Sequence, residues 1–438
     1  MMYDLDKKDL QKFAADFSKM QGTNVIARTV QQHGVVSPSQ DNAVLANLGR
    51  TFSEELSTGK VTNQKKSGRC WLFATLNTLR HDFEQKYNVE DFQFSQNYNS
   101  FYDRLEKANK FYEKIIELRN KPDDEREYLT FLKWGDYDGG QWANAAALIQ
   151  KYGLVPQYVM PETFSSNQTS EFNEVLNLKL KKDAAQIRKL AKNGTQELEL
   201  RVFKLKKMSE VYKMLVYAFG QPPVSFDFEY RDKDKAYHLD QNLTPNAFFE
   251  KYVARDFEDY VCLTDAPDHE VGKRYGLEAQ DYIYDAKHIE FLNVTTQELK
   301  DAAVAQLKDG EAVWFGCDVL QDMQREKGIL APEYFKKSEL FGIDLELDKA
   351  TRLATRQGEV SHAMTFTGVD IVDEKTTKWK VENSWSSKVG DEGYFIMSDK
   401  WFDEYMYEVI INKKYLTDQQ KELLNLEIQD LKPWDSLA

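Results

Sequence analysis

The stretch that decides the fold is Gln64-Lys65-Lys66-Ser67-Gly68-Arg69-Cys70-Trp71, and the apolar spacing of residues 72–79 predicts a helix that starts near Cys70. A cysteine in the first turn of a helix lies at the positive end of the helix dipole, which favours thiolate over thiol. Gln64, six residues upstream, can direct an amide N–H at an oxyanion beside the sulfur. This pairing indicates acyl transfer through a thioester, provided that the chain supplies a base.

A histidine and an asparagine late in the chain are the candidates for that base and its orienting partner. His362 opens a strand-like run over residues 361–369, and Asn383 follows it by 21 residues, at the end of another predicted strand. Two adjacent strands would place these side chains together. His362 would then take the thiol proton, while the Asn383 amide would hold the second ring nitrogen without adding charge.

Trp385, two residues after Asn383, would shield this hydrogen bond from water. Taken alone, the segment Asn383-Ser384-Trp385 is equally compatible with a turn followed by a core tryptophan. The order along the chain favours the catalytic interpretation, because an oxyanion donor, a nucleophile, a base and an orienting amide follow one another.

Composition and charge restrict the class of protein. The 438 residues are 42% hydrophobic and 13% aromatic, which predicts a substantial core divided over two or more subdomains. The sequence contains no run of about 18 apolar residues, so we expect no membrane span. The start of the chain also lacks the apolar segment of a secretion signal. The net charge of −14 argues against a nucleic-acid-binding surface.

The three cysteines, Cys70, Cys262 and Cys317, lie far apart and form neither a disulfide framework nor a metal-binding pattern. We therefore expect a reducing cytoplasm, no metal site and no cofactor. Cys262 and Cys317 have apolar neighbours, which is typical of buried thiols rather than of second nucleophiles.

The pattern of helices and strands changes along the chain. Helical spacing dominates the first part, whereas alternating apolar residues predict strands in the last part. This order predicts an α+β protein in which a helical lobe faces a β lobe. The expected helices are 8–20, 105–118, 141–152, 171–192, 199–219 and 296–308, and the expected strands are 312–316, 363–371, 378–382 and 393–397.

These motifs together resemble the papain-like cysteine peptidases. The residues around Arg69, the run Ser361-His362-Ala363-Met364, the segments 138–142 and 381–385, and the final Pro433-Trp434-Asp435 narrow the resemblance to the bleomycin hydrolase and bacterial aminopeptidase C branch. The resemblance covers most of the chain. It implies a papain-like two-lobe fold with large helical insertions, and a self-compartmentalised peptidase that acts on peptides as a homo-hexamer.

Five regions follow from this resemblance. The insertion at 166–300 is expected to be mainly helical and to carry the contacts between subunits, and a smaller helical insertion is expected near 100–135. The regions are a 1–60 N-terminal arm packing on the core, a 61–165 helical catalytic lobe, the 166–300 insertion, a 301–420 β-rich catalytic lobe, and a 421–438 C-terminal arm toward the cleft.

The resemblance also implies roles for single residues. Cys70 is the expected nucleophile, His362 the base and acid, and Asn383 its orienting residue, with Gln64 and the Cys70 N–H as the oxyanion hole. Glycines at 139 and 140 would let an extended substrate approach closely, although an ordinary helix-entry turn also explains them. The expected substrate-binding residues are Gly139, Gly140, Ser361, Trp385 and Ala438.

Two departures from the relatives bear on function. Ser386 stands where relatives usually have glycine, which is expected to change a local turn. Only Ser436, Leu437 and Ala438 follow Pro433-Trp434-Asp435, a shorter tail than is common in aminopeptidase C relatives. In those relatives the terminal carboxylate binds the free amine of the substrate. Three extended residues span about 10 Å, so this carboxylate is expected to stop short and leave room for internal cleavage.

Several functions therefore remain open from the sequence. The first is an aminopeptidase, and the second is an endopeptidase or oligopeptidase of the same family. Transglutaminase-like acyl transfer is disfavoured by Asn383 and Gln64, because such proteins generally use aspartate and lack the upstream glutamine. A non-catalytic hexameric binding protein is disfavoured by the complete set of four site residues and by the acidic charge.

Overall fold

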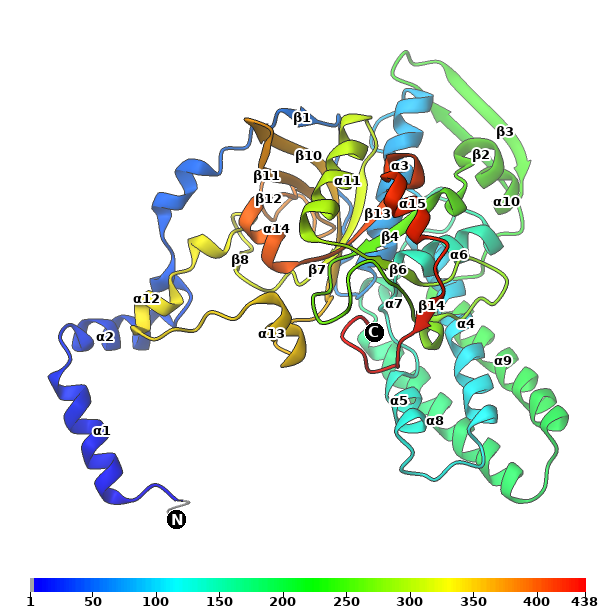
Figure 1. Cartoon of the computed structure of the whole chain (residues 1–438). Helices are drawn as coiled ribbons and strands as arrows, with labels where there is room; N and C mark the ends of the chain where they lie inside the picture. Colours follow the sequence, from blue (N-terminus) through cyan, green and yellow to red (C-terminus); the bar gives the residue numbers. More distant parts are fainter. Residues whose placement is uncertain (1–3) are drawn as a thin grey trace.

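The computed structural model describes residues 4–438 and combines a set of long helices with one large twisted sheet (Figure 1). Helices α4, α5, α8 and α9 gather at one end of the molecule, and the sheet with its flanking helices forms the other end. The fold class is therefore α+β, as the sequence predicts. The helices are α1 Lys7–Lys19, α2 Thr23–His33, α3 Cys70–Tyr87, α4 Gln96–Glu117, α5 Arg126–Trp134, α6 Trp142–Tyr152, α7 Phe164–Asn167, α8 Ser170–Lys192, α9 Glu197–Phe219, α10 Pro245–Phe248, α11 Thr296–Lys308, α12 Lys337–Phe341, α13 Lys349–Ala354, α14 Asp399–Tyr405 and α15 Asp418–Leu423.

The large sheet has twelve strands, eleven of them in the order β14-β5-β6-β4-β13-β7-β10-β11-β12-β9-β8, with β1 paired to β10 outside this path. A separate hairpin is formed by β2 and β3. The strands are β1 Glu54–Glu55, β2 Phe226–Arg231, β3 Tyr237–Leu243, β4 Tyr260–Thr264, β5 Arg274–Gly276, β6 Glu290–Asn293, β7 Val313–Cys317, β8 Met323–Gln324, β9 Ile329–Leu330, β10 His362–Val372, β11 Lys375–Glu382, β12 Tyr394–Ser398, β13 Met406–Asn412 and β14 Ile428–Asp430.

Strand β10 is central to the site because it touches elements from both ends of the chain. It runs antiparallel to β7 on one side and to β11 on the other. Successive residues on β10 face opposite sides of the sheet. Ala363 belongs to the buried cluster that contains Cys70, whereas Met364 belongs to a second cluster on the other side. The sheet therefore brings the residue next to His362 against the start of α3.

Helix α3 is the central helix, and nearly all of it is buried. Its buried residues include apolar ones such as Leu76 and polar ones such as Arg80 and His81, so the helix is covered on nearly every side. Trp71 contributes directly to the packing, since the Trp314 indole N–H donates to its backbone carbonyl at 3.1 Å. Helix α3 thus fixes the position of Cys70 relative to strand β7.

The region 166–300 contains strands as well as the helices expected of this insertion. Helices α8 and α9 occupy most of it up to Phe219, and the remainder contains the short helix α10, the start of α11, the β2–β3 hairpin and strands β4, β5 and β6. These last three strands are short and belong to the large sheet. Their brief apolar runs lack long alternation, so a sequence pattern alone does not distinguish them from loops.

The N-terminal arm also differs from the expected packing on the core. Helices α1 and α2 contain no buried residue, and in Figure 1 they extend away from the rest of the molecule. Contact with the main sheet begins after α2, where Val44 and Leu45 pack against a cluster that contains Ile329 of β9 and Ile396 of β12, and β1 then pairs with β10. Only the later part of the region 1–60 therefore contributes to this core.

Across residues 4–438, none of the helices combines the length and the apolar character that crossing a membrane requires.

Candidate active site

Cys70 is the first residue of α3, at the helix end where backbone N–H groups lack helical partners. No side chain caps this end. The backbone N–H groups of Cys70, Trp71 and Ala363 instead point toward the cysteine sulfur and lower the pKa of its thiol. The contact with Ala363 joins the start of α3 to the residue that follows His362.

Burial has the opposite effect on the same sulfur. It raises the pKa of the Cys70 thiol to about 11, although the three N–H groups act in the other direction. The N–H groups at the helix start therefore favour the thiolate, as the sequence indicates, but burial has the larger effect on the pKa of the thiol. A helix terminus contributes about 0.3–1 kcal/mol, less than one pKa unit, whereas burial shifts a pKa by several units.

His362 and Asn383 lie side by side, as the strand pattern predicts. Strands β10 and β11 are antiparallel, and Thr365 of β10 lies opposite Glu382 of β11. The His362 Nε2 is 3.0 Å from the Asn383 Oδ1. The Asn383 Oδ1 also accepts the Ser384 N–H at 2.8 Å, which fixes the amide. This arrangement leaves Nδ1 as the ring nitrogen that can exchange a proton.

Burial also acts on the imidazole and favours its neutral form. Burial lowers the pKa of His362 to about 4, and the hydrogen bond with Asn383 offsets this only in part. Trp385 covers the imidazole, with 4.8 Å between the ring centroids. Arg325 lies 4.5 Å from the Trp385 ring centroid and so extends this cover. The surroundings of the imidazole therefore exclude water, as expected for Trp385.

Gln64 is buried on the loop before α3, and both its backbone and its side chain form hydrogen bonds. Its backbone N–H donates to the Ser384 carbonyl at 2.8 Å, next to Asn383. Its side-chain Nε2 donates to the Ser67 carbonyl at 2.6 Å. An amide NH₂ has two hydrogens, so one remains for a developing oxyanion. Gln64 thus connects the segment that follows β11, which contains Asn383, with the loop that leads to Cys70.

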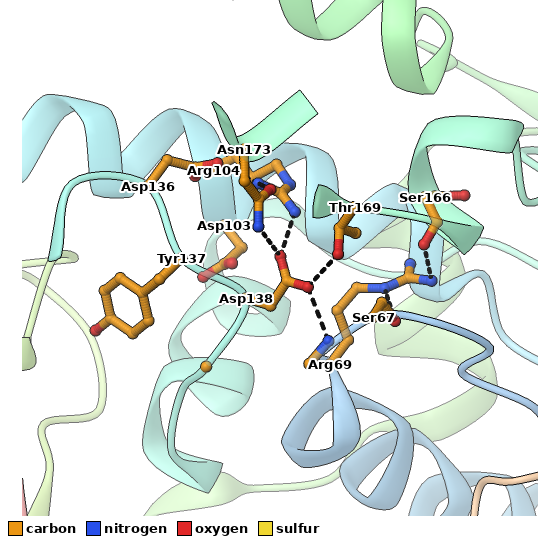
Figure 2. Close-up of polar contacts among 12 residues, drawn as sticks. Ser67, Arg69, Asp103, Arg104, Asp136, Tyr137, Asp138, Ser166, Thr169 and Asn173 are labelled. Carbon is orange, nitrogen blue, oxygen red and sulfur yellow. Dashed lines mark hydrogen bonds and ion pairs between the residues drawn. The ribbon is translucent and has the colours of Figure 1, made fainter. Parts of the chain in front are cut away.

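A buried polar network fixes the loop before Cys70 (Figure 2). The Arg69 guanidinium, 1% exposed, pairs with both carboxylate oxygens of Glu162 and donates to the Ser166 carbonyl at 2.7 Å. Its Nε donates to Ser67 Oγ at 3.0 Å, and that hydroxyl donates to the Gln64 carbonyl at 2.7 Å. Arg69 therefore holds the Gln64 loop in position through Ser67.

Asp138 is the second centre of this network. It accepts the Gly68 N–H at 2.8 Å, and it also bonds Thr169 of the loop before α8 (Figure 2). Its other oxygen accepts Arg104 at 2.5 Å and Asn173 at 3.0 Å. Burial alone would raise the pKa of Asp138, but these donors outweigh it and hold the value at about 2.

The glycines after Asp138 are close to the nucleophile. A Cβ at Gly140 would lie only 2.7 Å from the Trp71 ring, and the Trp71 indole N–H donates to the Asp138 carbonyl at 2.7 Å. The absence of a side chain at 140 thus permits tight packing on α3. At Gly139 a Cβ would meet only the Tyr137 ring, at 3.3 Å.

The two remaining expected site residues lie differently. Ser361 is exposed next to His362, and its hydroxyl donates to Asp318 at 3.2 Å. Leu437 is 1% exposed and belongs to the same buried cluster as Cys70, whereas Ala438 is exposed. Within residues 4–438, no basic side chain lies within 4.0 Å of the terminal carboxylate of Ala438.

Sequence reasoning missed Asp138 as a support and also missed Glu382. The Glu382 carboxylate is fully buried and binds Arg80 at 2.5 Å and His81 at 2.6 Å, both on α3. In the sequence, only the position of Glu382 directly before Asn383 points to a role for this residue. A buried carboxylate at a strand end requires partners, but the sequence does not identify them.

The fold and this site define a papain-like cysteine peptidase, a hydrolase. The chain belongs to the Peptidase C1-like family, which matches residues 4–438. It is 52% identical to aminopeptidase E of Lactobacillus helveticus and 51% identical to aminopeptidase G of Lactobacillus delbrueckii subsp. lactis, over all of each chain. The crystal structure of PepW from Lactobacillus rhamnosis HN001 is 42% identical, with a TM-score of 0.97 over 100% of this chain and 99% of that one.

Proposed function

We propose that the protein hydrolyses peptide bonds through a thioester on Cys70. The observation that carries this proposal is the hydrogen-bonded His362–Asn383 pair, whose neighbour Ala363 donates its N–H to the Cys70 sulfur. A base, its orienting amide and a nucleophile at a helix start are the parts that thiol-based acyl transfer needs.

The proposed reaction has two steps. The Cys70 proton passes to His362, and the sulfur attacks the substrate carbonyl. The Gln64 amide and the Cys70 N–H stabilise the oxyanion, and the leaving amine departs with the proton from His362. Water then gives a proton to His362 and attacks the thioester, which releases the carboxylic acid and restores the thiol.

The pKa shifts of Cys70 and His362 favour a paired proton transfer. Burial raises the pKa of Cys70 and lowers that of His362, so a lone charge on either group is disfavoured. Moving the proton between them creates two opposite charges that stabilise each other. The thiolate is therefore proposed to form together with the imidazolium.

Alkylation tests the nucleophile. One equivalent of iodoacetamide should modify Cys70 and abolish turnover of peptide amides, with the modified residue identified by peptide mass spectrometry. A bound substrate peptide should protect Cys70 from the reagent. Full turnover after complete Cys70 alkylation would overturn the proposal.

We further propose aminopeptidase activity. The relatives are named aminopeptidases E, G, W and C, and they are 38–52% identical over nearly the full length of this chain. Removal of single residues from the N-terminus of an unblocked peptide is the expected product pattern, and peptide mass spectrometry measures it directly.

Internal cleavage is the second candidate, and the short tail favours it. The Asp435 carboxylate lies 3.1 Å from His269, and the Ser436 hydroxyl donates to Asp268 at 2.6 Å. These contacts hold the tail at Asp435 and Ser436, which lie only three and two residues before Ala438. A carboxylate that stops short of the bound substrate would leave space for residues before the cleaved bond.

One peptide and its acetylated twin separate the two candidates. An aminopeptidase should cut only the unblocked peptide, from its first residue onward. An endopeptidase should cut both at the same internal bond. Mass spectrometry of the products over time decides between the two, and a protein that cuts neither would overturn both candidates.

Self-association into a homo-hexamer in the cytoplasm is also proposed. The resemblance places subunit contacts in 166–300, and helix α1 adds a second surface. Leu10, Phe13 and Phe17 lie on one face of α1 and are each more than half exposed. Light scattering after size-exclusion chromatography should find six copies. Replacing the three residues by serine should lower that number, whereas a monomeric unmodified protein would overturn the proposal.

A further inference from the structure

The turn between β8 and β9, residues 325–328, carries an arginine beside the candidate active site. The Arg325 guanidinium carbon lies 4.5 Å from the centroid of the Trp385 ring, and that centroid is 4.8 Å from the centroid of the His362 imidazole. The guanidinium is therefore at most about 9.3 Å from the imidazole, the sum of these two distances. Its charge acts on the site, because it contributes to lowering the pKa of His362.

Arg325 is exposed and has no partner for its charge. Across the described residues 4–438, its guanidinium lies over Trp385 but forms no ion pair and no hydrogen bond. Lys337, by contrast, pairs with Asp322 at 2.6 Å, just before the turn. The unpaired guanidinium gives this side of the site a positive charge, although the net charge of the chain is −14.

Hydrogen bonds fix this turn to its surroundings. The Lys327 carbonyl accepts from Arg50 at 2.7 Å, and the Glu326 carbonyl accepts the Gly390 N–H at 3.1 Å. Gly328 has a φ of 64°, and a Cβ there would lie only 2.7 Å from the Gly390 Cα, so the two loops pack closely. The backbone that carries the guanidinium is therefore held in one position.

The proposed reaction shows which part of the substrate comes close to this arginine. His362 gives its proton to the leaving amine, so the residue after the cleaved bond lies beside the imidazole. A hydrogen bond from the imidazole to the leaving nitrogen spans about 3 Å, one residue about 3.5 Å, and a second hydrogen bond about 3 Å. Together these lengths are close to the separation of the imidazole and the guanidinium.

We propose that Arg325 binds a carboxylate on the residue that directly follows the cleaved bond. This inference rests on the proposed peptidase function and concerns the leaving side of the same site. Two groups have this chemistry: the C-terminal carboxylate of a dipeptide, and the side chain of an aspartate or glutamate. A guanidinium that lies on an aromatic ring keeps the N–H groups at its edge free, and these groups match the two oxygens of a carboxylate.

The position of Arg325 at the surface sets the size of the expected effect. Water and salt weaken an exposed ion pair, whereas two charge-assisted hydrogen bonds to one carboxylate strengthen it. We therefore expect a preference of about fivefold for a carboxylate over an uncharged group of similar size. This preference should decrease as the salt concentration rises.

Turnover of four unblocked dipeptides tests the inference. The first pair is Leu-Ala with a free C-terminal carboxylate and Leu-Ala amide, and the second pair is Leu-Glu amide and Leu-Gln amide. In at least one pair, kcat/KM should be about fivefold higher for the carboxylate member. A preference in the first pair identifies the C-terminal carboxylate as the group that binds, and a preference in the second pair identifies the acidic side chain.

Arg325→Met removes the charge but retains an apolar side chain over Trp385, and it should abolish the preference. Lys327→Met is the matched control, because Lys327 lies in the same turn but donates to the Tyr334 hydroxyl at 3.3 Å. It should leave the preference unchanged. Equal kcat/KM within both pairs, or a preference that persists in Arg325→Met, would overturn the inference. A loss of kcat/KM in Arg325→Met that is equal for both members of each pair would also overturn it.

Binding of the same dipeptides to the inactive Cys70→Ser variant, measured by calorimetry, separates this inference from the peptidase proposal. The carboxylate member should again bind about fivefold more tightly, and adding Arg325→Met should remove the difference. If no dipeptide is cut but this Arg325-dependent difference in binding is present, only the peptidase proposal fails. Equal binding within both pairs would overturn the role of Arg325.

Discussion

At the scale of single residues, burial has a larger effect on the pKa of the Cys70 thiol than the nearby backbone N–H groups have. The sequence correctly predicts a cysteine at a helix start and a glutamine upstream of it. It does not show that the sulfur is buried, since burial depends on β10 and α3 packing together from positions almost 300 residues apart. Long-range packing of this kind leaves no periodic signal in one sequence.

Ser386 illustrates a residue whose effect the sequence only partly predicts. Its backbone φ is 73°, in the left-handed region that favours glycine. Ser386→Gly should therefore raise the free energy of unfolding by about 0.5 to 1 kcal/mol, measured by urea denaturation. Ser387→Gly is the control, because Ser387 has an ordinary φ and should lose stability. A destabilised Ser386→Gly would contradict this account.

Glu408 gives a pH-dependent prediction at the same scale. Its pKa in the folded protein is raised to about 8 by burial, so its contribution to stability is complete below pH 4 and disappears as pH rises through 8. Glu408→Gln should be more stable than the unmodified protein by about 3–5 kcal/mol at pH 9. The charged and titratable groups around it are Cys262 and Cys317 on the neighbouring strands and, along the cavity that Glu408 lines between α6 and the sheet, Glu258, Arg274, Lys287, His288, Glu290 and Lys413.

Denaturation of both proteins at pH 5 and pH 9 measures this difference. The two unfolding free energies should converge at pH 5. A difference that is equal at both pH values would show that Glu408 does not change its charge in this range.

At the scale of elements, α3 and β11 are joined by one buried ion network. Burial disfavours ionisation of Glu382, but Arg80 and His81 outweigh it and hold its pKa below the usual range. Because Glu382 directly precedes Asn383, this network positions the amide that orients His362. Local patterns predict both elements but not the contact between them.

Breaking this network should affect stability and catalysis together. Glu382→Gln should lower the free energy of unfolding at pH 7 by about 3 kcal/mol, because Arg80 would lose its buried counter-charge. The value of kcat should fall more than KM changes, since the His362 orientation is disturbed. Glu55→Gln is the control. Glu55 pairs with Lys380, which lies on the same strand as Glu382, but this ion pair is partly exposed and should contribute less than about 1 kcal/mol to the free energy of unfolding.

Equal effects of the Glu382 and Glu55 substitutions on stability would contradict the role given to the buried network.

The helices were easier to predict than the strands. The expected helix 296–308 coincides with α11, and 141–152 corresponds to α6, which ends at Tyr152 and is followed by Gly153 with a φ of 74°. Long periodic segments and glycine stops are local signals. Strands β4, β5 and β6 have five residues or fewer and pair with each other or with the distant strands β13 and β14, so the sequence did not predict them.

At the scale of the whole molecule, the tail returns to the main body, and Leu437 belongs to the buried cluster that also contains Cys70. His269 lies between Asp268 and Asp435, and these carboxylates raise its pKa to about 9. The sequence predicted a short arm toward the cleft but could not identify this clamp, because its partners are more than 160 residues apart.

Removing the clamp should free the tail. His269→Ala should make Ala438 and Leu437 about tenfold more sensitive to carboxypeptidase, since the charged hydrogen bonds to Asp435 are lost. The unmodified tail should be protected at pH 7 and lose protection as pH rises through 9, where His269 becomes neutral. His288→Ala is the control, because His288 pairs with Asp281 away from the tail. Identical trimming of both variants would contradict the clamp.

The most direct test of the central claim is the turnover of Cys70→Ser on an unblocked peptide, with Cys262→Ser as the matched control. The account predicts that Cys70→Ser lowers kcat by at least about 10⁴-fold while its unfolding free energy stays near that of the unmodified protein. Cys262→Ser should retain most of its activity. Cleavage by Cys70→Ser at a rate comparable to that of the unmodified protein would contradict catalysis through a Cys70 thioester.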